Sequence, residues 1–139
     1  MNADLAKIYP GIPEYFNGEG RGMYHYLTGS ASWYLLTLVT QVLGIRGQWG
    51  DLLLAPKLVP EQFGKSGQIA AEVSFAGKWL KVTYLNRSRK PYGQYRIESV
   101  LLQGNTLPVV PPPIAEILIP RAQLAEQSSP TVDITVVLA

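Results

Sequence analysis

One segment, residues 30–43, constrains the fold of this chain more than any other. Its apolar residues recur at helical spacing in two adjacent rows, which are Ala31, Leu35, Leu38 and Val42, and beside them Leu36, Val39 and Leu43. Polar residues are few, so the apolar arc is wider than the single stripe of an ordinary surface helix. The sequence therefore predicts a helix that is covered on more than one side, which one small sheet cannot do.

Both ends of this expected helix carry the residues that commonly end helices. Thr28 or Ser30 can cap its amino terminus, because a side-chain oxygen there accepts a hydrogen bond from an unpaired backbone N–H. Gly44 stands where the chain leaves the helix, a position that favours a left-handed conformation. The first 28 residues show no helical or strand period and predict a shaped loop, which is functional or lies against further protein.

After Gly50 the apolar period changes to two, which is the period of a strand with one buried face. Residues 68–75 and 80–84 form an expected hairpin around Ala76 and Gly77. Further strands are expected at 95–101, 106–109, 114–119 and 131–138, with Gly104 and Asn105 as a tight turn. The predicted fold class is α+β and mainly β, with one long helix followed by a small antiparallel β-sandwich.

Composition excludes several classes of function. The net charge is only +2 and the basic residues are scattered, so neither nucleic acid nor a membrane is expected as a partner. There is no cysteine and one histidine, so no metal site is expected, and a reducing cytoplasm is the expected location. No stretch approaches the roughly 20 apolar residues that span a bilayer.

The start of the expected helix is the best candidate for a binding site. Thr28 and Gly29 place a hydroxyl and a glycine beside backbone N–H groups that have no helical partner. Helix amino termini attract anions, and a glycine lets an oxyanion approach the main chain closely. Plain capping explains the same residues, so on physical grounds alone both interpretations stay open.

Three segments are informative when they are taken together, namely Ile12-Pro13-Glu14-Tyr15, Leu27-Thr28-Gly29-Ser30-Ala31-Ser32-Trp33 and Leu43-Gly44-Ile45-Arg46. In this order they resemble glycoside hydrolase family 94, the phosphorylases of cellobiose, diacetylchitobiose and β-1,2-linked oligoglucans. The resemblance spans residues 9–86. It implies that residues 1–47 are the end of an (α/α)6 catalytic barrel, with its last helix, and that residues 48–139 are the carboxy-terminal β-sandwich domain.

The resemblance also implies an activity, inverting phosphorolysis, in which phosphate attacks the anomeric carbon of a β-glucoside and takes its glucosyl unit. An aspartic acid protonates the glycosidic oxygen, and no cofactor is needed besides phosphate as co-substrate. Thr28 and Gly29 match the residues that hold this phosphate. The family's acid lies upstream, in a part of the barrel outside this sequence, so the chain alone is expected to hold no catalytic residue and to be inactive.

Five further residues near the motif are candidate contacts for phosphate or sugar, namely Ser30, Arg21, His25, Glu14 and Tyr15. A guanidinium matches phosphate bidentately, but Arg21 between two glycines equally suits a loop brace. Tyr15 offers a face for a pyranose or packs against the helix. For each of these five residues, contact with a ligand and a purely structural role both stay open.

Two other functions compete with the phosphorylase interpretation. Trp49 and Trp79 suggest a carbohydrate-binding β-sandwich module, although both tryptophans are expected to pack in the core. Alternatively, the chain is a structural or interaction domain whose apolar helix docks on a partner subunit. In every case the apolar helix predicts self-association of the isolated chain into a homo-oligomer.

Overall fold

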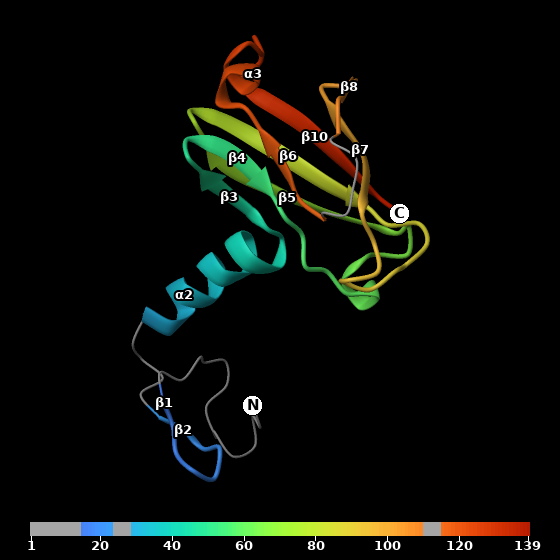
Figure 1. Cartoon of the computed structure of the whole chain (residues 1–139). Helices are drawn as coiled ribbons and strands as arrows, with labels where there is room; N and C mark the ends of the chain where they lie inside the picture. The colour runs from blue at the N-terminus through green and yellow to red at the C-terminus, as the bar shows by residue number, and fades with distance from the viewer. Residues whose placement is uncertain (1–14, 24–28, 110–114) are drawn as a thin grey trace. The chain divides into compact units, whose positions relative to one another are not determined.

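The computed structural model describes residues 15–23, 29–109 and 115–139, shown in Figure 1. Over these residues the fold is mixed α+β and mostly β. The chain divides into two compact units, Met1–Leu38 and Val39–Ala139. The second unit includes β3 (Ile45–Gln48), which is hydrogen-bonded to the strand that follows it.

In the first unit, part of the expected loop is a small hairpin of β1 (Tyr15–Phe16) and β2 (Gly22–Met23). The side-chain oxygen of Asn17 accepts hydrogen bonds from the backbone N–H of Glu19 at 3.1 Å and of Arg21 at 2.8 Å. These bonds close the turn without any apolar period, which explains why sequence periodicity does not reveal the hairpin.

The expected helix is confirmed as α2 (Gly29–Thr37), which continues as a π-helical segment, η1 (Leu38–Val42). The backbone carbonyls at its carboxy terminus find partners in the second unit. Arg46 donates to the carbonyl of Thr40 at 3.2 Å, and the Lys57 N–H donates to that of Val42 at 2.9 Å. Gly44 ends the helical segment with φ +67°, as its position in the sequence predicted.

The larger sheet contains five strands in the order β5-β6-β10-β7-β8. Their bounds are β5 Gln68–Phe75, β6 Lys78–Leu85, β7 Ile97–Leu102, β8 Asn105–Leu107 and β10 Thr131–Leu138. The expected hairpin is confirmed, since β5 and β6 pair antiparallel around Ala76 and Gly77, both at positive φ, as a tight hairpin turn requires.

One pairing departs from the antiparallel arrangement that the sequence predicted, because β10 runs parallel to β6. The chain between these strands crosses to the smaller sheet and returns through α3 (Arg121–Ala125). It re-enters the larger sheet at Pro130, whose carbonyl accepts a hydrogen bond from the N–H of Trp79 at the start of β6 (2.9 Å). Strand β10 therefore begins beside the start of β6 and runs in the same direction.

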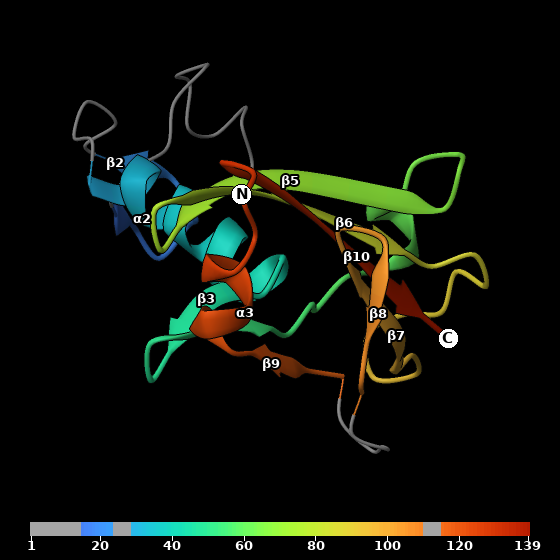
Figure 2. The ribbon, with the colours of Figure 1, turned by 90° about the horizontal axis from the view of Figure 1, so that it is seen from above.

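The smaller sheet has three strands in the order β3-β4-β9, with β4 at Asp51–Leu54 and β9 at Ile117–Ile119. After β4 the chain passes through a short 3-10 turn, η2 (Pro60–Gln62). Figure 2 shows β3 and β9 on one side of β5, β6 and β10. Both sheets supply the same core, to which the smaller one gives Ile45, Leu52, Leu54 and Ile119 and the larger one gives Leu80, Val82, Val100, Val132, Ile134 and Val136.

Gly44 lies where two main-chain segments of the second unit approach each other closely. Its carbonyl accepts a hydrogen bond from the N–H of Ala55 at 2.9 Å, and a Cβ on Gly44 would overlap the carbonyl group of Ala55. Backbone atoms cannot give way as a flexible side chain does. A side chain at this position is therefore disfavoured by the positive φ and has no space beside Ala55.

We expect Gly44→Ala to lower the free energy of unfolding by about 2–5 kcal/mol, because left-handed strain adds to backbone overlap. Urea unfolding followed by circular dichroism measures this loss. Gly104→Ala is the matched control, since Gly104 has φ +79° with nothing near its missing Cβ. That control should cost only about 1 kcal/mol, and equal losses for the two variants would show that the close approach to Ala55 contributes nothing.

Candidate functional site

The structure places two of the predicted phosphate-site residues at the start of α2. Gly29 is the first residue of the helix and Ser30 the second, and the first turn contains no acidic side chain. The positive end of the helix dipole is therefore not neutralised by a carboxylate of its own turn. Thr28, His25 and Glu14 lie outside the described residues.

Tyr15 and Arg21 share the β1–β2 hairpin of the same unit. Tyr15 pairs with Met23 across the hairpin and its side chain is exposed. Arg21 is exposed as well, and its backbone N–H is held by Asn17, which gives the residue a place in the turn independent of any ligand. The loop-bracing role that the sequence left open for Arg21 is thus carried by its main chain, which leaves the guanidinium at the surface.

Both tryptophans that were expected in the core are at the surface, so that expectation is wrong. Trp49 lies in the turn between β3 and β4 at φ 55°, with 93% of its surface exposed. Trp79 is 58% exposed on β6, next to the fully buried Leu80. The alternation of β6 assigns Leu80, Val82 and Tyr84 to the core, so Trp79 must face outward.

Trp79 lies on the outer, mostly polar face of the five-stranded sheet. In the register of the sheet its neighbours on the two adjoining strands are Ser74 and Thr131. The next row on the same face is charged, with Lys81 between Glu72 and Asp133. The arrangement combines one exposed aromatic ring with hydroxyl, ammonium and carboxylate groups, which are the groups that bind sugar hydroxyls.

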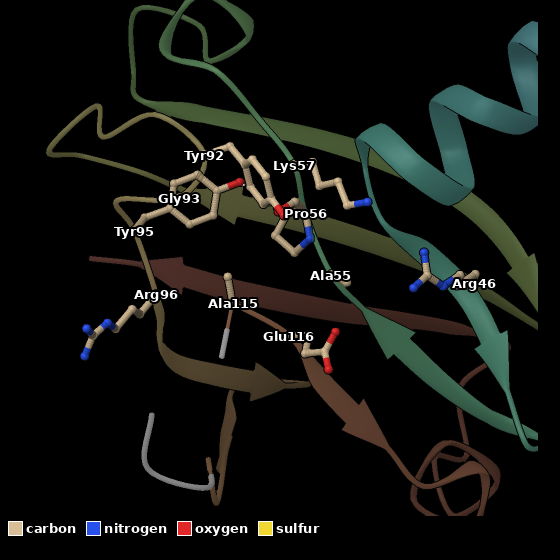
Figure 3. A pocket seen from close by; sticks show the side chains of 10 residues that line it. All are labelled: Arg46, Ala55, Pro56, Lys57, Tyr92, Gly93, Tyr95, Arg96, Ala115 and Glu116. Atoms are coloured by element: carbon tan, nitrogen blue, oxygen red, sulfur yellow. Dashed lines mark hydrogen bonds between the residues drawn. The ribbon is translucent and has the colours of Figure 1, made fainter. Parts of the chain in front are cut away.

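The second unit also contains a hollow of about 580 Å³, which Figure 3 shows. Its lining residues are Arg46, Ala55, Pro56, Lys57, Tyr92, Gly93, Tyr95, Arg96, Ala115 and Glu116. In Figure 3 the side chain of Arg96 points away from the side on which Arg46, Lys57 and Glu116 lie, so the three cations of the lining do not converge on one point. Arg46 already donates to the carbonyl of Thr40. The hollow is therefore weakly organised for an anion.

The floor of this hollow is held by a buried tyrosine. The Tyr95 hydroxyl donates to the carbonyl of Pro56 at 2.8 Å and accepts from the N–H of Leu58 at 2.8 Å. Burial raises the pKa of Tyr95, an effect that the hydrogen bond from Leu58 partly opposes. The phenol stays neutral and can serve as donor and acceptor at once, which ties the segment after β4 to the segment before β7.

Sequence reasoning missed the hollow because its residues come from four separate stretches of the chain with no motif in any of them. Among the described residues, no group of three or more histidine, aspartate or glutamate side chains is placed to hold a metal ion. No helix in the described ranges is long and apolar enough to cross a membrane. The chain matches no protein-family model, and no curated protein matches it significantly.

We expect Tyr95→Phe to lower the free energy of unfolding by about 2–4 kcal/mol, because it leaves the Leu58 N–H and the Pro56 carbonyl buried without a partner. Chemical denaturation measures the change. Tyr92→Phe is the control, since Tyr92 is exposed and its ring meets Tyr95 edge to face at 6.3 Å without needing the hydroxyl. That variant should stay within about 0.5 kcal/mol of the natural protein. If both substitutions have the same effect, the buried hydroxyl has no special role.

Proposed function

We propose that this chain is the carboxy-terminal part of an inverting glycoside phosphorylase related to glycoside hydrolase family 94. In this proposal residues 1–47 belong to the end of an (α/α)6 barrel, and residues 48–139 are the family's small β-sandwich domain. The full enzyme transfers a glucosyl unit from a β-linked glucan or disaccharide to inorganic phosphate in the cytoplasm. The residues of this chain form part of the phosphate site, and the catalytic aspartic acid belongs to the rest of the barrel.

The observation that carries the proposal is the exposure of α2, which has no buried residue over its whole length. Trp33 and Leu35 are 69% and 63% exposed, and Tyr34 and Leu36 are exposed too. A helix that is apolar on most sides is normally buried in the interior of a larger protein. Further helices of a barrel are the cover that α2 requires, and without them α2 is expected to drive self-association of the isolated chain.

The following segment contrasts with α2 because its apolar residues are covered within this chain. Val39, Val42 and Leu43 pack against the core of the second unit. The expected helix therefore has two environments, one supplied here and one supplied by further protein. This division fits a segment that passes from a catalytic barrel into a carboxy-terminal domain.

The phosphate site of the proposal is built on the first turn of α2. Thr28 and Gly29 hold the phosphate together with the first backbone N–H groups of the helix, as the resemblance implies. Ser30, Arg21, His25, Glu14 and Tyr15 are the further contacts for phosphate or sugar. The bound phosphate then attacks the anomeric carbon while the aspartic acid of the barrel protonates the leaving oxygen.

We expect inorganic phosphate to shift the amide resonances of Gly29 and Ser30 in a saturable manner when the ¹⁵N-labelled chain is titrated by NMR. Thr28→Val should weaken this binding about tenfold or more, because a hydrogen bond to a charged group is lost. Thr106→Val, at an exposed position in β8, should leave it unchanged. Resonances of Gly29 and Ser30 that stay fixed throughout the titration would contradict the phosphate site. The chain alone should show no phosphorolysis of β-linked glucans.

We propose carbohydrate binding by the outer face of the larger sheet as the second candidate function, because Trp79 is exposed there among polar groups. A tryptophan ring stacks on the apolar face of a pyranose, and neighbouring polar side chains bind its hydroxyl groups. Ser74, Thr131 and Asp133 are near enough in the sheet register to serve in this way. This function needs no phosphate and no further barrel.

We expect β-linked glucose oligosaccharides to change the tryptophan fluorescence of the chain if this face binds glycans. Trp79→Ala should abolish binding measured by calorimetry, whereas Trp33→Ala, which removes an even more exposed ring from α2, should preserve it. Binding that survives Trp79→Ala would exclude this face. Glycan binding at Trp79 with no phosphate effect at Gly29 would favour the binding-module function over the phosphorylase function.

A further inference from the structure

The outer strand of the larger sheet, β5, has one unused edge. It pairs only with β6, and the two-residue turn between Phe75 and Lys78 makes these two a hydrogen-bonded pair. The odd-numbered residues of β5 therefore bond to β6, and the even-numbered ones turn their N–H and C=O groups outward. The Gln68 carbonyl accepts from the Gly64 N–H at 3.0 Å. Ala70, Glu72 and Ser74 have no backbone partner among the described residues.

Apart from the charge of Glu72, this edge lacks the features that usually keep sheet edges from pairing with other chains. Strand β5 is eight residues long, contains no proline, lysine or glycine, and pairs with β6 along its whole length without a bulge. The other described edges are short or interrupted. Strand β8 has three residues before Pro108, β9 has three before Pro120, and β3 has four residues including Gly47.

The inward side of β5 is also incompletely covered. Ile69, Ala71, Val73 and Phe75 face the core but are only half-buried, whereas Leu80, Val82 and Tyr84 on the neighbouring strand are fully buried. A further strand beside β5 would cover these apolar groups and satisfy the outward backbone groups at the same time.

We propose that the free edge of β5 pairs antiparallel with the β5 of a second copy of this chain, about a two-fold axis perpendicular to the sheet. A two-fold contact uses the same strand on both copies, so the outward N–H and C=O groups of one strand meet those of the other. The inward faces of the two strands stay on the same side of the joined sheet. The second copy thus supplies both kinds of missing contact.

The pleat and the charges of β5 select one register. Even-numbered residues must oppose even-numbered ones, since only these carry free backbone groups and share the outer face. The longest overlaps of this kind place either Ala71 or Glu72 on the axis. With Glu72 on the axis two carboxylates oppose each other, which is unfavourable. With Ala71 there, Glu72 faces Ala70 of the second copy, and Ile69 faces its Val73.

This register predicts opposite effects for two charges introduced at one exposed position, Ala70. Ala70→Lys places an ammonium opposite Glu72 of the second copy, twice per dimer, and should tighten dimerisation about twofold to thirtyfold. Ala70→Glu should weaken dimerisation by a similar factor. Sedimentation equilibrium measures the dimer dissociation constants of the two variants. Both variants also carry Leu35→Glu, which suppresses association through α2. Thermal unfolding of the dilute monomers serves to show that both variants fold.

Equal dimerisation of the two Ala70 variants would overturn the proposal, and so would the absence of dimers of Ala70→Lys at the highest soluble concentration. Neither outcome bears on the phosphate site, because the Ala70 substitutions leave Thr28 and Gly29 untouched. If β5 pairs instead with a strand of a different protein, the purified chain will form no dimer. That result would equally exclude the second copy as the partner of this edge.

A single cysteine tests the register directly, because the natural chain contains none. Ala71 faces Ala71 of the second copy as a non-hydrogen-bonded pair with Cα atoms about 4.5 Å apart, within the range that a disulfide spans. Ala71→Cys should therefore form a disulfide dimer under mild oxidation. Glu72→Cys is the control, and it should remain monomeric despite its greater exposure. Faster crosslinking of Glu72→Cys than of Ala71→Cys would contradict the proposed register.

Discussion

The close crossing of Gly44 and Ala55 is the constraint on which the second unit depends. At this point the helical segment ends, the smaller sheet begins with β3, and the chain leaves β4 for the larger sheet. The Gly44 carbonyl and the Ala55 N–H hold the crossing together at 2.9 Å, and no Cβ fits between the two main chains. Two buried tyrosines extend this junction, since Tyr84 donates to the Leu43 carbonyl at 2.7 Å and Tyr95 bridges Pro56 and Leu58.

Sequence periodicity predicted the elements whose hydrogen bonds are local. The α2 helix and the β5–β6 hairpin were predicted because helical spacing, alternation and turn residues all act over a few positions. The parallel pairing of β10 with β6 was not, since an alternating strand has the same pattern in either direction. Strands β3 and β4 were missed because each has only four residues, and the buried run Leu52–Leu54 shows no alternation.

The residues of the candidate sites also differ in whether the local sequence could predict them. The helix start at Gly29 and Ser30 was predicted because it is visible in a few adjacent residues, whereas Thr28, His25 and Glu14 lie outside the described residues. The exposure of Trp79 follows from its register against Leu80, which side-chain size alone cannot reveal. The hollow beside Tyr95 joins segments far apart in the chain and has no local signature.

The two uncovered surfaces of this chain require different kinds of cover. The side chains of α2 are apolar and its backbone is bonded within the helix, so any well-packed apolar surface stabilises it. Strand β5 instead presents backbone N–H and C=O groups, which only another strand can satisfy in regular order. Helices that bury α2 supply side-chain contacts only, because their own backbone groups are already bonded, so they do not replace the strand that β5 needs. The two proposals therefore concern different kinds of contact.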